Sequence, residues 1–478
     1  MSMKMINGFE AVIGLEVHAE LKTDTKIFCS CPTGFGAEPN TQCCPVCMGF
    51  AGALPVLNKR AVEYAIKAGL ATNCRIARRT RLDRKNYFYP DLPKGYQISQ
   101  DELPLCRDGY LDIEVSGERK RIGITRIHIE EDAGKLIHGE DGETRIDFNR
   151  CGVPLIEIVS EPDIRSADEA RAYLRKLRTV LMYAGVSDCR MNEGAFRCDV
   201  NISVRRAGES ELGTRAEIKN INSFNFVGRA IEYEYARQVP IVLGGGSVVQ
   251  ETRRFDPDTG KTYSMRSKEN AKDYRYFPEP DTPGFEIDEA HIKRLAAQIP
   301  VLPDERRQMY RSEYGLSESD AEILTSSLSL SQYFEECARQ TAYPKSLSSL
   351  IISEILREQS ADDFCCPISA SHLSELVTLW GEGVINSSTA KKLLCEMMGS
   401  DISPAQTVKE RGLSQINDES VLRELLLQVM SEERKSVEDY RNGKRSAAKA
   451  IIGKVMARTS GRANPTLLSK IAYEELDK

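Results

Sequence analysis

Four cysteines near the start of the sequence constrain the fold more than any other feature. Cys29 and Cys31 form a CxC pair, Cys44 and Cys47 form a CxxC pair, and a short loop separates the two pairs. This spacing places four thiolates around one ion with tetrahedral geometry, which predicts a zinc site. Four protein ligands leave no open position, so we expect the zinc to stabilise the fold. Unrelated buried thiols are the alternative, and Cys43 could replace Cys44 as a ligand.

The length and composition of the chain indicate a multidomain protein of the ordinary soluble class. A chain of 478 residues exceeds what one hydrophobic core accommodates, so we expect two to four domains. No apolar run approaches the length of a membrane span, and the first residues lack the features of an export or transit signal. We therefore expect a cytoplasmic protein with no membrane contact. Fourteen cysteines in such a chain indicate reduced thiols and one metal site.

The composition and periodicity of the sequence divide the chain into three parts. Residues 1–295 are rich in β-branched segments that do not alternate regularly with helices, which favours an α+β domain with antiparallel strands. Helices are expected within it at residues 59–72 and 166–185. Helical periodicity with few glycines then predicts an all-α helical domain over residues 296–404. A break at Pro404 leads to a small all-α tail domain, residues 405–478.

Carboxylates and a histidine occur at positions that suit metal binding or acid–base chemistry. Side chains alternate along a strand, so Glu16, His18 and Glu20 share one face of the first expected strand. Such a row suits a divalent cation or acid–base chemistry. The alternative is a surface strand with an ordinary polar outer face, which has the same sequence pattern. Glu157 lies among Leu155, Ile156 and other apolar residues. It needs a partner such as a metal ion if its face is buried, and the alternative is that it points outward.

Two stretches interleave basic and aromatic residues, and the tail is locally basic. Residues 78–97 and 272–278 contain basic side chains, which can bind phosphate, and aromatic rings, which can stack on bases. The alternative is an aromatic core with solvated charges at its edge. Net charge is only −6, so contact with nucleic acid requires a local patch. Residues 441–470 contain no acidic residue, which predicts a surface for the phosphate backbone; a solvated helix face is the alternative. The candidates are Lys444, Arg445, Lys449, Lys454, Arg458 and Arg462.

Eight long, collinear motifs resemble the B subunit of the tRNA-dependent amidotransferases, the GatB/GatE family. The resemblance covers essentially the whole chain. It implies a β-rich cradle domain, a helical domain and a small helical tail, in agreement with the division above. The motifs are GLEVHAELKT at 14–23, DRKNYFYPDLPKGYQISQ at 83–100, HIEEDAGK at 128–135, PLIEIVSEPD at 154–163, FRCDVNIS at 196–203, EIKNINSFN at 217–225, DYRYFPEPD at 273–281 and GKVMARTSGRANP at 453–465.

The resemblance implies a ligase that converts misacylated Glu-tRNA(Gln), Asp-tRNA(Asn) or both. In the family, ATP phosphorylates the side-chain carboxylate of the tRNA-bound amino acid, and ammonia then displaces the phosphate. The ammonia comes through a channel from an amidase (glutaminase) subunit, and a small third subunit completes a heterotrimer. Which misacylated tRNA is used depends on the synthetases of the cell. The rival interpretation is a zinc-stabilised RNA-binding protein without chemistry; a zinc hydrolase is disfavoured because four thiolates leave no open position.

The resemblance also implies roles for individual residues. Its magnesium-centred site matches Glu16, His18, Glu131 and Glu157, with His18, Glu131 and Glu157 as ligands of Mg²⁺. A histidine ligand is unusual because Mg²⁺ prefers oxygen. Asp199 and Lys219 match supporting positions. The cysteine motif occurs in part of the family, where zinc looks structural, and the basic tail would bind tRNA.

Overall fold

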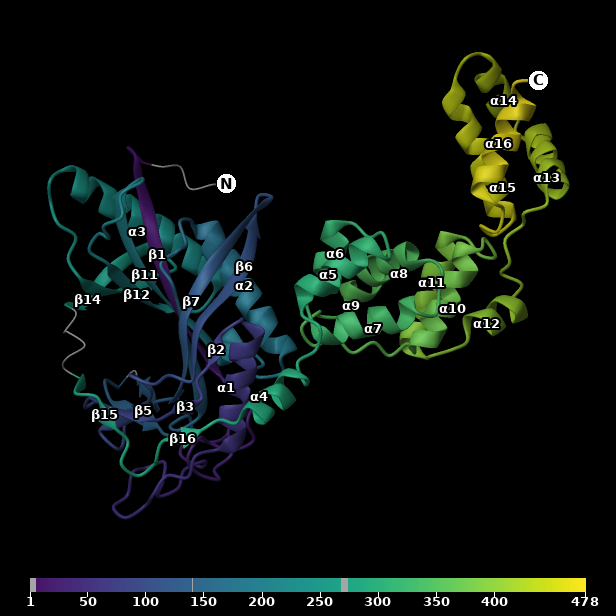
Figure 1. The fold of residues 1–478 in the computed structure, drawn as a ribbon. Helices are drawn as coiled ribbons and strands as arrows, with labels where there is room; N and C mark the ends of the chain where they lie inside the picture. Colours follow the sequence, from purple (N-terminus) through teal and green to yellow (C-terminus); the bar gives the residue numbers. More distant parts are fainter. Residues whose placement is uncertain (1–5, 140, 268–273) are drawn as a thin grey trace. The chain divides into compact units, whose positions relative to one another are not determined.

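The computed structural model describes residues 6–139, 141–267 and 274–478 (Figure 1). The chain separates into two compact units, Met1–Leu302 and Pro303–Lys478. Strands and helices mix in the first unit, and helices make up the second, which confirms the predicted α+β class. The division into three domains at residues 295 and 404 stays a prediction. Within the described ranges, no helix combines the length and the apolar character needed to cross a bilayer.

A nine-stranded sheet forms the centre of the first unit, with the strand order β14-β13-β12-β11-β1-β10-β7-β6-β2. Neighbouring strands pair antiparallel, apart from the parallel pair β12 and β13. The strand nearest the N-terminus, β1, therefore lies in the middle of the sheet. The strands are β1 Phe9–Glu20, β2 Arg75–Ile76, β6 Cys106–Val115, β7 Glu118–Glu131, β10 Pro154–Ser160, β11 Phe196–Arg206, β12 Ala216–Ile221, β13 Glu251–Asp256 and β14 Lys261–Ser267.

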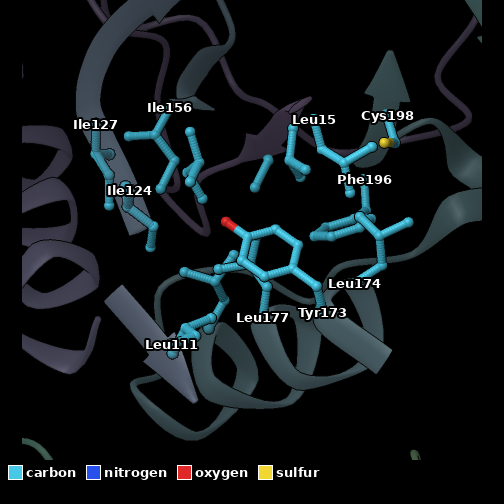
Figure 2. Close-up of a cluster of buried hydrophobic side chains, with 14 of the residues drawn as sticks. Leu15, Leu111, Ile124, Ile127, Ile156, Tyr173, Leu174, Leu177, Phe196 and Cys198 are labelled. Atoms are coloured by element: carbon cyan, nitrogen blue, oxygen red, sulfur yellow. The ribbon is translucent and has the colours of Figure 1, made fainter. Parts of the chain in front are cut away.

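One face of this sheet is covered by helices and forms the main hydrophobic core (Figure 1). The helix α2, Ala167–Tyr183, begins where the Ser166 side chain accepts a hydrogen bond from the backbone N–H of Glu169. Its apolar residues recur at helical spacing and face the sheet. Figure 2 shows Tyr173 and Leu177 of α2 packed against apolar side chains of the strands. The helices predicted at residues 59–72 and 166–185 are confirmed as α1, Lys59–Ala71, and α2.

The alternation of side chains along β1 assigns its two faces. Leu15, Val17 and Ala19 are buried on the core side. Glu16 and His18 therefore point to the other face of the sheet, as the sequence predicts. That polar face is the one that carries the candidate site.

Three smaller sheets and further helices complete the first unit. β15, β4 and β5 form one small sheet, β16 pairs with β3, and β8 pairs with β9. The elements are β3 Arg79–Thr80, β4 Asp83–Asn86, β5 Tyr96–Ser99, β8 Lys135–His138, β9 Thr144–Asp147, β15 Phe277–Pro278, β16 Phe285–Glu286, η1 Met191–Glu193, α3 Phe224–Leu243 and α4 Glu289–Ala296.

The second unit consists of helices around two separate hydrophobic clusters. The first cluster is built on α5 Pro303–Ser312, α6 Glu318–Leu324, α7 Leu328–Ala338, α8 Pro344–Leu350, the π-helix η3 Ile351–Ile355, α9 Leu356–Glu358, α10 Ala370–Gly381, α11 Ser387–Gly399 and α12 Pro404–Glu410. The second is built on α13 Glu419–Glu432, α14 Arg434–Arg441, η4 Arg445–Ala447, α15 Ala448–Arg458 and α16 Pro465–Leu476.

Candidate active site

The register of three central strands assembles a cluster of histidines and carboxylates on the polar face. His18 of β1 lies opposite Glu157 of β10, and Glu157 lies opposite His128 of β7. His18 Nε2 is 3.3 Å from Glu157 Oε2 and 3.5 Å from Glu130 Oε1. His128 Nε2 is 3.7 Å from Glu130 Oε2 and 3.8 Å from Glu157 Oε2. One donor atom from each of His18, Glu130 and Glu157 lies within 4.8 Å of the others, so the three could hold one cation.

The charges of this cluster are set by its burial and by mutual contacts. Burial alone would lower the pKa of His18, but its hydrogen bond to Glu157 and the charges of Glu157 and Glu130 raise it to about 9. Burial would raise the pKa of Glu157, yet His128 and His18 hold it below its usual range. Burial would also raise the pKa of Glu130, but a hydrogen bond from His128 and the charge of His18 lower it. Both carboxylates therefore remain ionised although little of either is exposed. A divalent cation bound between them would replace the proton of His18 as their counter-charge.

Glu131, the third magnesium ligand expected from the resemblance, does not join this cluster. Adjacent residues of a strand point to opposite sides, so Glu131 faces away from Glu130. Both of its carboxylate oxygens lie 2.5 Å from Lys94 Nζ, and Oε1 accepts a hydrogen bond of 2.9 Å from the backbone N–H of Ile98. The structure thus brings His18 and Glu157 together and puts Glu130 where the sequence analysis expected Glu131.

Glu130 and His128 are the residues that the sequence analysis missed as members of the cluster. A signal for them exists in the sequence. Ile127 and Ile129 are fully buried on the core side of β7, so the alternation assigns the residues at 128 and 130 to the polar face.

A second group of carboxylates lies beside the first on the same face. One oxygen each from Glu16, Asp199 and Glu217 lies within 4.8 Å of the others. Lys219 Nζ binds Asp199 at 3.0 Å and lies 3.4 Å from Glu217, while the side-chain N–H of Asn201 donates to Glu16 at 3.0 Å. Burial and the neighbouring carboxylates raise the pKa of Glu16. The structure therefore brings the predicted residues together: Glu16 on the same strand as His18, Asp199 opposite Glu16 on β11, and Lys219 on the next strand, β12.

Glu20 ends the polar row of β1 in a different environment. Burial, together with the charge of Asp132, raises its pKa to about 7. Asp132 itself accepts a hydrogen bond of 2.7 Å from Arg197 and lies 3.6 Å from Arg150. Glu20 therefore belongs to an arginine–carboxylate network at the end of the strand.

The two basic and aromatic stretches fold against each other next to the His18 cluster. β4 carries Lys85 and pairs with β15. Lys85 Nζ lies 5.0 Å from the ring centre of Tyr274 and 5.8 Å from that of Tyr87. Burial would lower the pKa of Lys85, but the charges of Glu130 and Glu157 raise it. A cation held between rings beside two carboxylates suits a phosphate-bearing substrate. Lys272 and Asp273 of the second stretch lie outside the described residues.

The four cysteines predicted to bind zinc converge in the loops that follow β1. One sulfur each from Cys29, Cys31, Cys44 and Cys47 lies within 4.8 Å of the others. A hydrogen bond from Cys29 lowers the pKa of Cys47 to about 4. Cys43 lies outside this group, with its sulfur 3.9 Å from the side-chain oxygen of Asn149. The donor set fits a tetrahedral four-thiolate zinc site, with Cys44 in the place that Cys43 could have taken.

The six basic candidates of the tail differ in their surroundings. Arg458 pairs with Glu432 at 2.7 Å, Lys454 pairs with Glu433, and Lys444 pairs with Asp439 at 3.4 Å. Arg462 donates a hydrogen bond to the backbone carbonyl of Gly412, which ties two segments of the unit together. Arg445 and Lys449 are exposed and make no ion pair with the described part of the chain. These two cations are therefore the most available to an external anion.

Comparison with known proteins places the chain in a family. Residues 11–293 match the GatB/GatE catalytic domain, and residues 332–476 match the GatB domain. A relative from Caldicellulosiruptor saccharolyticus is 55% identical over 477 residues, which cover 98% of this chain and 99% of the relative. A relative from Geobacter sulfurreducens is 52% identical over 475 residues, with the same coverage. Both are named as the B subunit of aspartyl/glutamyl-tRNA(Asn/Gln) amidotransferase. This chain belongs to the GatB/GatE family.

Proposed function

We propose that the chain is the B subunit of a tRNA-dependent amidotransferase and carries the kinase step of transamidation. The similarity extends over almost the full length of the named relatives, which supports the reaction as a whole. The observation that carries the kinase step is the cluster of His18, Glu130 and Glu157, in which Glu130 is buried and the other two are partly exposed. We place the protein in the cytoplasm, as expected from its sequence.

The reaction requires activation of a poor electrophile. The side-chain carboxylate of tRNA-bound glutamate or aspartate attacks the γ-phosphorus of ATP, and ADP leaves. Ammonia then attacks the acyl phosphate, inorganic phosphate leaves, and an amide remains on the tRNA. The first step brings a carboxylate toward a triphosphate, so the site needs positive charge between them.

The polar face of the sheet provides the groups that this step needs. His18, Glu130 and Glu157 would hold Mg²⁺, which neutralises phosphate charge in phosphoryl transfer. Lys85 offers an ammonium to phosphate oxygens beside the cluster. Beside the cluster, a supporting role falls to three residues that lie close together on neighbouring strands, Glu16, Asp199 and Lys219. Glu131 holds the ammonium of Lys94 on the other side of β7.

The remaining requirements fall to partners and to the other regions of the chain. We propose that an amidase (glutaminase) subunit supplies ammonia and that a small third subunit completes a heterotrimer. Zinc on the four cysteines stabilises the loops next to β1. Arg445 and Lys449, together with the other basic residues of the tail, bind the tRNA backbone.

The test is transamidation by the complex with its partners, with Glu-tRNA(Gln) and Asp-tRNA(Asn) assayed in parallel. Glu157→Gln removes one charge from the cluster with little change in shape, so we expect at least about a 100-fold lower rate of amide formation. Binding of charged tRNA stays unchanged because Glu157 does not lie in the basic tail. Glu114→Gln, on an exposed position of β6, is the matched control. Full activity of Glu157→Gln, or no amide from the wild-type complex with either tRNA, contradicts the proposal.

A further inference from the structure

A buried lysine touches the cysteine quartet. The side chain of Lys26 is among the largest fully buried side chains of the described residues, with 1% of the residue exposed. Its Nζ lies 3.6 Å from Cys47 Sγ and 3.3 Å from the backbone carbonyl of Phe148. The ammonium therefore has two partners, and one of them is a sulfur of the predicted metal site.

A buried ammonium requires a negative charge nearby, because its transfer from water is costly unless it is paired. No carboxylate of the described ranges lies within ion-pair distance of Lys26. Glu131 borders the same small cavity as Lys26, but its carboxylate is already bound to Lys94. The anion that faces Lys26 is therefore the cysteine quartet itself.

The position of Lys26 suits the charge of a four-thiolate site. Four thiolates and one Zn²⁺ carry a net negative charge, and this charge is least hydrated where the site is most buried. Cys47 is that point: it is 4% exposed, whereas Cys29, Cys31 and Cys44 are half-buried. Lys26 contacts the ligand whose charge water can stabilise least.

The backbone holds Lys26 in this place from two sides. Its own N–H donates a hydrogen bond of 2.9 Å to the carbonyl of Cys31, and the N–H of Ile27 donates to the carbonyl of Gly152 at the same distance. Gly152 has a φ of +81°, and a Cβ there would lie 3.6 Å from Cys47 and 3.7 Å from Lys26. The segment that precedes β10 thus packs against both the lysine stem and the metal-binding loop.

We propose that Lys26 is the counter-charge of the zinc site and a positioning residue for Cys47. This inference rests on the zinc site of the proposed function. The hydrogen bond from the ammonium to the Cys47 sulfur stabilises the metal-bound quartet more than the metal-free one, because zinc binding requires all four sulfurs to be thiolates and so increases the negative charge that faces the ammonium. Lys26 therefore increases the affinity of the quartet for zinc and slows the release of the metal.

The experiment compares variants of Lys26 in the full-length chain within its complex. Lys26→Met removes the charge and keeps the length, Lys26→Arg keeps the charge, and Lys22→Met removes an exposed lysine that pairs with Asp188. We expect Lys26→Met to bind zinc roughly 10- to 100-fold more weakly in competition with a chromophoric chelator, as is typical of outer partners of metal ligands. Lys26→Arg restores most of the affinity, and Lys22→Met matches the wild type.

A spectroscopic readout separates a charge effect from a general loss of stability. With Co²⁺ in the quartet, removal of a hydrogen bond to a thiolate shifts the sulfur-to-cobalt charge-transfer band to lower energy. Lys26→Met shows this shift and Lys26→Arg does not. If Lys26→Met fails to fold, Lys26→Leu, which also lacks a hydrogen-bond donor, replaces it, with the same shift expected.

Three outcomes would overturn the inference or its basis. If the folded Lys26→Met or Lys26→Leu variant has wild-type zinc affinity and an unshifted band, the role proposed for Lys26 is wrong, and the zinc site itself is unaffected. A loss of zinc in Lys26→Arg as large as in Lys26→Met shows that packing, and not charge, is what matters. A wild-type chain that binds no stoichiometric zinc with its cysteines reduced defeats the zinc site itself, and leaves the kinase cluster untouched.

Discussion

The cysteine quartet draws its ligands from one short stretch of sequence, whereas the His18 cluster draws its members from three strands, β1, β7 and β10. Turns and a bound ion would hold the quartet together. Ladders of backbone hydrogen bonds hold the cluster, because its strands lie at the centre of the nine-stranded sheet. We therefore expect the quartet, as a local arrangement, to depend on the proposed zinc, whereas the geometry of the cluster follows from the strand order.

This difference predicts how each region fails. Loss of one carboxylate in the cluster leaves the sheet intact and removes chemistry. Loss of zinc from the quartet removes a structural support and affects chemistry through the hydrogen bonds that join its loop to the strands. Ile27 donates to the carbonyl of Gly152, and Gly152 donates to the carbonyl of Asp132, immediately after β7.

The largest effect is expected from a comparison of the neighbours Glu130 and Glu131. Glu130→Gln reduces amide formation by at least about 100-fold, because it removes a charge from the proposed cation site. Glu131→Gln instead leaves Lys94, whose side chain is only 10% exposed, without its carboxylate, and we expect a loss of about 3–5 kcal/mol in the free energy of unfolding. Amide formation by the complex and urea unfolding of the chain measure the two effects.

A double variant provides the control for this pair. Lys94→Met combined with Glu131→Gln removes both charges, so the free energy of unfolding recovers toward the wild-type value. No recovery in the double variant, or equal unfolding free energies for Glu131→Gln and Glu130→Gln, would contradict the assignment of the two carboxylates to opposite sides of β7.

A smaller effect is expected at the cysteines. Cys47→Ser removes the most buried ligand, and we expect loss of zinc, a thermal midpoint lower by several degrees and roughly tenfold slower amide formation. Metal analysis and calorimetry of the chain, before and after chelation, measure this. Cys43→Ser is the matched control because its sulfur lies outside the quartet. Equal losses in the two variants would show that Cys43 takes part in metal binding.

The same contrast explains what could be predicted from the sequence. The convergence of the cysteine group could be predicted from spacing alone, apart from the choice between Cys43 and Cys44, which the structure makes in favour of Cys44. His18 and Glu157 follow from alternation along single strands. To decide whether Glu130 or Glu131 belongs to the cluster, one must also know which face of β7 is buried. The contact between Glu157 and His128 depends on the order of the strands in the sheet, which no local sequence pattern gives.

In the tail, the prediction from sequence missed ion pairs with residues outside the basic stretch. Residues 441–470 contain no acidic residue, so the sequence predicts a local basic surface. In the structure, α13 packs against α15, and Glu432 and Glu433 from its end pair with Arg458 and Lys454. Acidic residues outside the basic stretch thus neutralise part of it, because helix packing joins segments that are separate in the sequence.

The smallest effect is therefore expected in the tail, and it should depend on these ion pairs. Lys449→Gln removes an exposed cation without an ion pair in the described ranges, and we expect tRNA binding a few-fold weaker, with the slope of log K against log salt smaller by about one. Lys454→Gln removes a cation that Glu433 already partly neutralises, so its effect on both quantities is smaller. Binding of charged tRNA across a salt series measures both variants. Equal slopes for the two would mean that tRNA displaces Glu433 from Lys454, and that the ion pairs of the free tail do not decide which cations bind the phosphate backbone.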